Sequence, residues 1–277
     1  MLTYAEHYKK CKEQSGYPKP KVDIYDFTHA VVDVTSNSED DLIQLPKNYM
    51  EIVNGAKNRY KELMKNPSNM NIPRDPMIDF AIRIQTIHDS PEFEALAQVI
   101  IPQIEQNMFG CNVVMEALYA YRNVHRDAPQ RASWLWHYDN NPKEIIKVMV
   151  YLSDVDEDCG AFEIVCNEEG EAVKMPTYKI DHKTWNGAPN NSRITEAQLN
   201  TMASEGYYPY KILGKKGTIA IFDNNIAHRA SIPMSSNTRD AIVFMIRPWC
   251  TKEEKYINKK HCRAWTGTSI FMNPEEI

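Results

Sequence analysis

The apolar positions follow a helical period in the first part of the chain and a β period afterwards. Residues 46–64 carry apolar side chains at helical spacing, which predicts an amphipathic helix. Shorter helices are expected over 5–12 and 76–88. A further helix is expected over 90–110, where a capping residue and an early proline mark the start and a glycine marks the end. We therefore expect 1–110 to form a mainly helical region.

From residue 111 the pattern changes to short runs rich in β-branched and aromatic residues, separated by turns. Such runs at this spacing are typical of a sandwich or closed barrel and not of a parallel α/β sheet. The expected class is therefore α+β, with a β core over 111–250 and a tail over 251–277. The expected strands are 112–121, 132–138, 145–152, 161–165, 217–222 and 239–246.

A long irregular segment, residues 166–216, interrupts the β core. It contains prolines, a cluster of asparagines and several aromatic residues, among them Trp185. Loops of this length in compact domains are usually functional covers or disordered insertions. The aromatic content favours order, and we expect either a cover over a substrate site, with Trp185 in contact with substrate, or a surface insertion.

Composition excludes several classes of function. The chain has 277 residues, 43% of them hydrophobic and 25% charged, with a net charge of -5. This acidic balance gives no bulk reason to bind nucleic acid or anionic membrane. The first residues resemble no secretory signal, no apolar run is long enough to span a bilayer, and the six cysteines form no C-x-x-C pair. We expect a cytoplasmic protein with reduced thiols.

Candidate metal ligands come from a His-x-Asp pair that ends an apolar run. On an extended chain the side chains of His137 and Asp139 point the same way. With His228 downstream they have the composition of a 2-His-1-carboxylate facial triad. A second pair, His125 and Asp127, lies in a polar stretch, and we interpret it as a solvated loop.

The residues around the first pair resemble those of the phytanoyl-CoA dioxygenase family. The resemblance rests on the run from His137 through Asn140-Asn141-Pro142, on 147–155 and 159–162, and on the later run 217–223 followed by His228 and Arg239. It covers about residues 112–248. This family belongs to the iron(II)/2-oxoglutarate-dependent oxygenases and folds as a double-stranded β-helix, or jelly roll. The chain departs from the family's pattern after the fourth strand, at 166–170.

The resemblance implies a reaction and a set of roles. His137, Asp139 and His228 would bind Fe(II), and Arg239 would receive the distal carboxylate of 2-oxoglutarate. Oxygen would then hydroxylate a C–H bond of a small-molecule substrate, with release of succinate and CO₂. The carboxylate at Asp139 favours hydroxylation over halogenation, because related halogenases have a small residue there.

Several assignments stay open at this point. Arg229 and Arg247 are rivals of Arg239 for the anion, and Arg247 has the same strand parity as Arg239, so contact with substrate is expected. Met149 and Tyr151 also share a parity; they line the pocket in one interpretation and are ordinary core residues in the other. A metal-binding, cupin-like protein that is non-catalytic or independent of 2-oxoglutarate is the alternative function.

Overall fold

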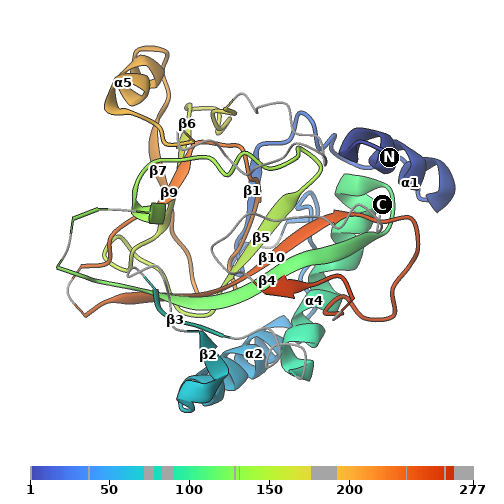
Figure 1. Ribbon diagram of the computed structural model, residues 1–277, viewed down its shortest axis with the longest axis horizontal. Coiled ribbons are helices and arrows are strands. Elements are labelled where there is room, and N and C mark those ends of the chain that lie inside the picture. Colours follow the sequence, from blue (N-terminus) through green and yellow to red (C-terminus); the bar gives the residue numbers. More distant parts are fainter. Residues whose placement is uncertain are drawn as a thin grey trace.

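The computed structural model describes residues 2–36, 38–71, 78–82, 90–127, 129–130, 132–175, 192–234, 236–258 and 260–264. Within these ranges the chain forms two β-sheets and a helical layer (Figure 1). The main sheet has the strand order β1-β8-β5-β10-β4-β3-β2, with antiparallel neighbours, and β11 pairs in parallel with β4. Its strands are β1 (His29–Val32), β2 (Met70–Asn71), β3 (Ile78–Ile82), β4 (Val113–Val124), β5 (Ile146–Tyr151), β8 (Ile219–Asp223), β10 (Thr238–Pro248) and β11 (Arg263–Ala264).

The small sheet has the order β7-β6-β9 and lies on the opposite side of the main sheet from α2 and α4 (Figure 1). Its strands are β6 (Phe162–Cys166), β7 (Tyr208–Ile212) and β9 (His228–Ala230). The helices are α1 (Tyr4–Ser15), α2 (Tyr49–Met64), α4 (Pro91–Ile104) and α5 (Glu196–Ser204). Short 3₁₀ turns, η1 (Pro67–Asn69) and η3 (Ala132–Trp134), and a π-helical turn, η2 (Glu105–Phe109), complete the described elements.

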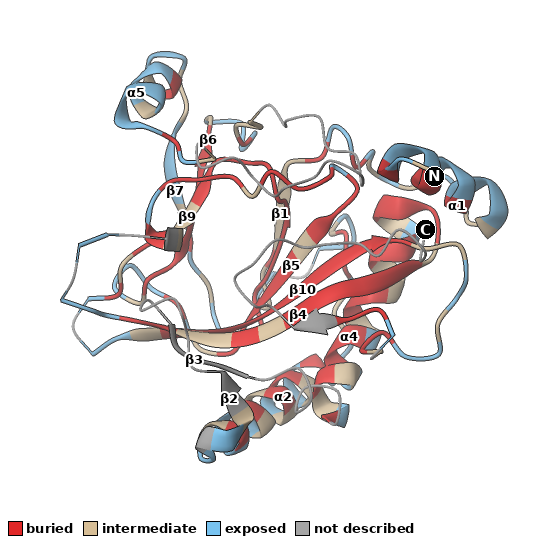
Figure 2. Cartoon of the chain, in the orientation of Figure 1, coloured by how far each residue is buried: buried red, intermediate tan, exposed pale blue. Residues whose placement is uncertain are grey.

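Alternation along the central strands divides the interior into two cores. On β5, Val148 and Val150 face the helices, whereas Met149 and Tyr151 face the small sheet. Because both faces of the main sheet are covered, its central strands are buried along their length (Figure 2). The helical side is packed with aliphatic and aromatic side chains. The side toward the small sheet carries the polar residues described below.

Two sequence-based predictions of elements were wrong. The helix expected over 76–88 is replaced, where it is described, by β3, whose apolar residues alternate with a period of two. The strand expected over 132–138 begins instead as the turn η3. The indole N–H of Trp134 donates to Asn123 Oδ1 at 3.4 Å and the ring is buried, so tertiary packing prevails over β propensity.

The segment 166–216 supplies part of the small sheet. Its strand β7 pairs with β6, and α5 begins at Glu196 after the N-cap Thr195, which forms a capping box with Gln198. Neither β7 nor β1 was predicted. Residues 176–191, which include Trp185, lie outside the described ranges. Among the described helices, none has both the length and the apolar character needed to cross a bilayer.

Gly160 gives a prediction about stability. It has φ +74°, and a Cβ there would lie 2.5 Å from Asn123 Nδ2 and 2.5 Å from Pro233 Cγ. We expect Gly160→Ala to lower the free energy of unfolding by about 3 kcal/mol, from backbone strain and overpacking together. Gly170, with φ +81° and open space around it, is the matched control, and its alanine variant should lose only about 1 kcal/mol. Equal losses in urea unfolding would contradict the packing argument.

Candidate functional site

His137 and His228 lie directly opposite each other on paired extended segments. The His137 N–H donates to the His228 carbonyl at 3.0 Å, and the His228 N–H donates to the His137 carbonyl at 2.9 Å. A reciprocal pair of this kind places both side chains on one face of the ladder. Their ring centroids are 4.4 Å apart. Backbone pairing therefore brings together two histidines that are far apart in the sequence.

Asp139 completes the group on the same face. Its N–H donates to the carbonyl of Asn224 at 2.9 Å, which continues the pairing past His137. Asp139 Oδ1 lies 3.9 Å from His137 Nε2, and Oδ2 lies 3.8 Å from His228 Nε2. The ligand atoms of all three residues lie within 4.8 Å of one another. The three residues singled out from the sequence thus converge.

Backbone carbonyls fix the orientation of both imidazoles. His137 Nδ1 lies 2.8 Å from the Leu135 carbonyl, and His228 Nδ1 lies 2.8 Å from the Ile226 carbonyl. A carbonyl only accepts, so each Nδ1 carries the proton and each Nε2 presents a lone pair toward Asp139. Burial, and then the neighbouring His228, lowers the pKa of His137 to about 3, and burial also lowers the pKa of His228. Both rings are therefore neutral, which is the form that binds a metal.

Lys147 is a member of the site that the sequence interpretation missed. It projects from β5, and its Nζ lies 2.5 Å from Asp139 Oδ2. Burial alone would raise the pKa of Asp139, but the positive charge of Lys147 beside it outweighs burial and holds the pKa below its usual range. For Lys147, burial acts to lower the pKa, but Asp139 and then Tyr119 raise it above its usual range. The pair is therefore a carboxylate and an ammonium.

The donor set fits a divalent first-row metal ion. Two imidazole nitrogens and one carboxylate on one face are the ligands of a facial triad, and their orientations are already fixed. Neighbouring ligands at 2.0–2.2 Å from an ion stand about 3.0 Å apart. The donors are 3.8–3.9 Å apart here, so binding would draw them together by almost 1 Å. The carboxylate would then be shared between the ion and Lys147.

Arg239 lies in the same cavity, on β10, and is 1% exposed. Its Nη1 donates to Met149 Sδ at 3.1 Å, and the guanidinium carbon lies 5.9 Å from the Tyr151 ring centroid. Within the described part of the chain, its Nε has no hydrogen-bond partner. Among the described residues, no carboxylate forms an ion pair with it. A buried cation whose neighbours are neutral is costly unless an anion binds beside it.

The cavity lies between the two sheets and is lined from both. Tyr119, Tyr121 and Asn123 share a parity on β4, as Lys147 and Met149 do on β5. These residues could have been found from strand parity once the strands were located. The full lining comprises Tyr119, Tyr121, Asn123, Ser133, His137, Asp139, Lys147, Met149, Phe162, Phe222, His228, Arg229, Ala230 and Arg239.

The remaining expected site residues occupy other positions. Tyr151 is buried below Arg239, and its hydroxyl donates to the Ile212 carbonyl at 2.7 Å, which ties the two sheets together. Arg247 does not line the cavity; its Nε lies 2.6 Å from Glu116 Oε2. Eight residues of strand, about 26 Å, separate it from Arg239. Arg229 lines the cavity, but its Nε lies 2.6 Å from Glu163 Oε2, so its charge is neutralised by this ion pair.

The rival pair, His125 and Asp127, lies outside the site. Both residues are exposed beyond the end of β4, and His125 Nδ1 lies 2.8 Å from the Pro233 carbonyl. Neither belongs to a cluster of possible metal ligands within the described part of the chain. The choice between the two His-x-Asp pairs is thus supported by geometry.

Lys147 competes with a metal ion for Asp139, which gives a second prediction. In Lys147→Met the carboxylate keeps its negative charge but loses its buried partner, so the metal-free protein should lose about 3–5 kcal/mol of stability. A bound ion would no longer share the carboxylate, so Fe(II) affinity should rise. Thermal unfolding with and without the ion, together with a calorimetric titration, measures both effects. Weaker Fe(II) binding by Lys147→Met would show that Lys147 supports the ion and does not compete with it.

Comparison with known proteins gives matches in structure only. The crystal structure of EctD from S. alaskensis with bound Fe aligns with a TM-score of 0.50 at 13% identity, over 88% of this chain and 83% of that chain. The epimerase SnoN in complex with Fe³⁺, alpha ketoglutarate and nogalamycin RO aligns at 0.49, with 8% identity over 87% and 83%. HygX from Streptomyces hygroscopicus with nickel and 2-oxoglutarate bound aligns at 0.47, with 14% identity over 81% and 85%. No family model and no curated protein sequence matches the chain.

At such identities the likeness establishes the fold. The α+β class, a double-stranded β-helix of the jelly-roll type with helices on one face, is confirmed. In this fold the two sheets face each other and the side chains between them can enclose a site. The converging histidines, Asp139, Lys147 and Arg239 all lie in that space.

Proposed function

We propose that this chain is an Fe(II)- and 2-oxoglutarate-dependent dioxygenase that hydroxylates a C–H bond of a small-molecule substrate. The proposal rests on one observation: the cavity combines a facial-triad donor set with a buried arginine, Arg239, that forms no ion pair with any described residue. The fold shared with the iron-bound structure of EctD is consistent with it.

The charge of the cavity favours a dianionic co-substrate. Asp139 contributes one negative charge, and Lys147 and Arg239 contribute one positive charge each. The charge of Arg229 is neutralised by Glu163. A divalent ion would therefore leave the cavity with an excess of about three positive charges. A dicarboxylate removes two of them and places an anion beside each buried cation. 2-Oxoglutarate has this charge.

Each end of the co-substrate has a candidate partner. The Arg239 guanidinium can donate two parallel hydrogen bonds to the distal carboxylate. Lys147 would stay beside Asp139, and its positive charge would favour an anion at the metal site. When bound, iron and 2-oxoglutarate would supply the oxidising power that converts O₂ and a substrate C–H bond into the hydroxylated product, succinate and CO₂.

The protein's own residues would orient the metal and limit the site. The carbonyls of Leu135 and Ile226 hold the two imidazoles with Nε2 inward. Phe162 and Phe222 pack against His228, with ring centroids 5.5 Å and 5.8 Å away, and form an apolar wall. This wall keeps water from one side of the metal ligands. The half-buried Ser133, Arg229 and Ala230 leave room for substrate to enter.

The alternative, a binding protein without turnover, draws on one observation. The ammonium of Lys147 already neutralises Asp139 without an ion. Measurement of succinate on addition of Fe(II), ascorbate and 2-oxoglutarate separates the two functions, since uncoupled turnover needs no known substrate. Candidate substrates can then be screened for a gain of one oxygen by mass spectrometry. Fe(II) binding without any consumption of 2-oxoglutarate, in the presence of all substrate classes screened, would favour the alternative.

A further inference from the structure

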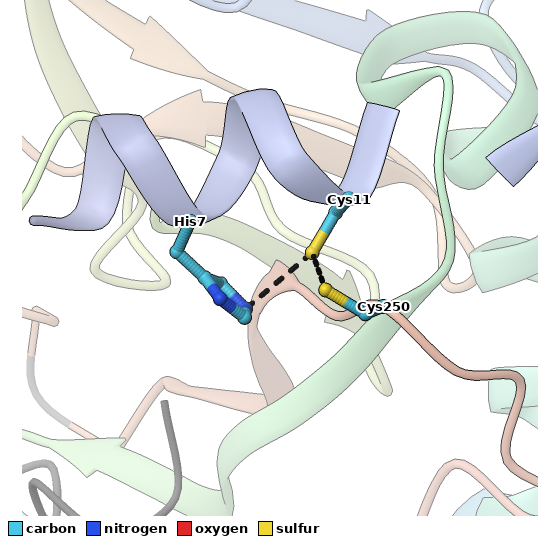
Figure 3. Close-up of side chains that lie close together, drawn as sticks. All are labelled: His7, Cys11 and Cys250. Carbon is cyan, nitrogen blue, oxygen red and sulfur yellow. Dashed lines mark hydrogen bonds between the residues drawn. The ribbon is translucent and has the colours of Figure 1, made fainter. Parts of the chain in front are cut away.

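A second group of metal-type ligands lies at the contact between α1 and the end of β10. His7 and Cys11 are four residues apart on one face of α1, and both point toward Cys250, two residues beyond β10 (Figure 3). Cys11 Sγ lies 2.8 Å from Cys250 Sγ and 3.4 Å from His7 Nε2. The three ligand atoms all lie within 4.8 Å of one another.

Ordinary hydrogen bonding accounts for this group only in part. His7 is 6% exposed, and among the described residues its Nδ1 makes no hydrogen bond of normal geometry, only a weak contact with the backbone of Pro248. The neighbour of its Nε2 is a sulfur, which is a weak donor and a weak acceptor. Buried polar groups in native proteins are nearly always paired, so an imidazole in this position calls for another partner. The Trp249 ring, 5.7 Å from that of His7, covers one side of the group.

We propose that His7, Cys11 and Cys250 bind a divalent ion of the zinc type. One imidazole and two thiolates are the ligands that Zn²⁺ prefers in proteins. Two thiolates neutralise the two charges of the ion. Metal binding requires the neutral imidazole and the two deprotonated thiols, so it would release protons from the cysteines.

The distances require only a small adjustment. In a tetrahedral zinc site with Zn–S near 2.3 Å and Zn–N near 2.0 Å, sulfur and nitrogen stand about 3.6 Å apart and two sulfurs about 3.8 Å apart. The distance from Cys11 to His7 already fits. The sulfur of Cys250 would move away from that of Cys11 by about 1 Å, and Cys250 is half-buried on a loop. With three protein ligands, a water molecule would take the fourth position.

The expected role is structural. Cys11 lies on α1, and Cys250 lies two residues beyond β10, the strand that carries Arg239. An ion held by both elements would fasten the N-terminal helix to the core. This site differs from the triad in its chemistry, because it offers sulfur where the triad offers a carboxylate oxygen.

Cobalt(II) substitution tests the proposal, because thiolate-to-cobalt charge transfer reports sulfur ligation and the triad contains no sulfur. The full-length protein is reduced, stripped of metal with a chelator and titrated with Co(II). We expect a near-ultraviolet charge-transfer band that saturates at one ion per chain and disappears on addition of Zn(II). Cys11→Ser and Cys250→Ser should lose the band. His137→Ala and Cys159→Ser should keep it, Cys159 being a half-buried cysteine outside the group.

The wild-type titration decides the proposal even if a serine variant fails to fold. A reduced wild-type protein that binds Co(II) without a thiolate band would overturn it. So would a disulfide between Cys11 and Cys250, detected as a two-dalton loss in mass that persists under the reducing conditions of the titration. If the band remained in both serine variants and both were folded, it would come from other cysteines, and the proposal would be wrong.

Discussion

His137→Ala and Asp139→Ala are each expected to lower iron-dependent succinate formation by more than about 100-fold. Loss of a residue that merely orients a metal ligand typically costs 10–100-fold in metal affinity or activity, so loss of a ligand should cost more. Both residues have ligand atoms within 4.8 Å of His228. Succinate release at saturating 2-oxoglutarate measures the effect, and Fe(II) binding by calorimetry shows whether it arises from the metal.

The matched control is His125→Ala in the other His-x-Asp pair. His125 is exposed, and its contact is with the Pro233 carbonyl. We expect wild-type succinate formation from this variant. Equal loss in His125→Ala and His137→Ala, with both proteins folded by circular dichroism, would refute the assignment of the metal ligands.

Arg239→Met is expected to raise the KM for 2-oxoglutarate by about 10- to 150-fold. The estimate follows from the 1.5–3 kcal/mol typical of a hydrogen bond to a charged group, at about 1.4 kcal/mol for each factor of ten. Fe(II) affinity should change little, because Arg239 is not a ligand. Removal of a buried cation that forms no ion pair among the described residues should leave the midpoint of thermal unfolding unchanged or raise it.

Arg247→Met supplies the control, because Arg247 is buried to the same extent but pairs with Glu116. This substitution removes the buried ion-pair partner of Glu116, so it should cost about 3–5 kcal/mol of stability. The KM for 2-oxoglutarate, measured on the folded fraction of Arg247→Met, should equal that of the wild-type protein. The two arginine variants are therefore expected to behave oppositely. A raised KM in Arg247→Met, or a destabilised Arg239→Met with unchanged KM, would contradict this expectation.

The sequence predicted much of the fold because the two faces of the main sheet are both buried. Strands β4, β5 and β10 therefore appear in the sequence as nearly continuous apolar runs, without the 3.6-residue spacing of an amphipathic helix. The triad was predictable because His-x-Asp places two ligands on one face of an extended chain, whether or not that chain is a strand. Residues 132–138 show the limit, since only His137 makes a ladder contact there.

Strand parity gives the face of a residue but not its position along the strand. Arg247 has the parity of Arg239, yet it lies near the opposite end of β10 and pairs with Glu116. The register between β10 and β4 also shifts between Met245 and Ile246, which lie between the two arginines. The sequence also contained a signal for Lys147 that was not used. A single cation in an apolar strand is expensive to bury, so it indicates a functional position.

Binding of 2-oxoglutarate to the Fe(II)-loaded protein without oxygen tests the central claim most directly. The predicted result is a visible charge-transfer band that saturates at one 2-oxoglutarate per chain, is absent in Asp139→Ala, and needs about 10- to 150-fold more 2-oxoglutarate in Arg239→Met. An Fe(II)-loaded wild-type protein that gives no such band, or a band with equal 2-oxoglutarate affinity in Arg239→Met, would contradict the account.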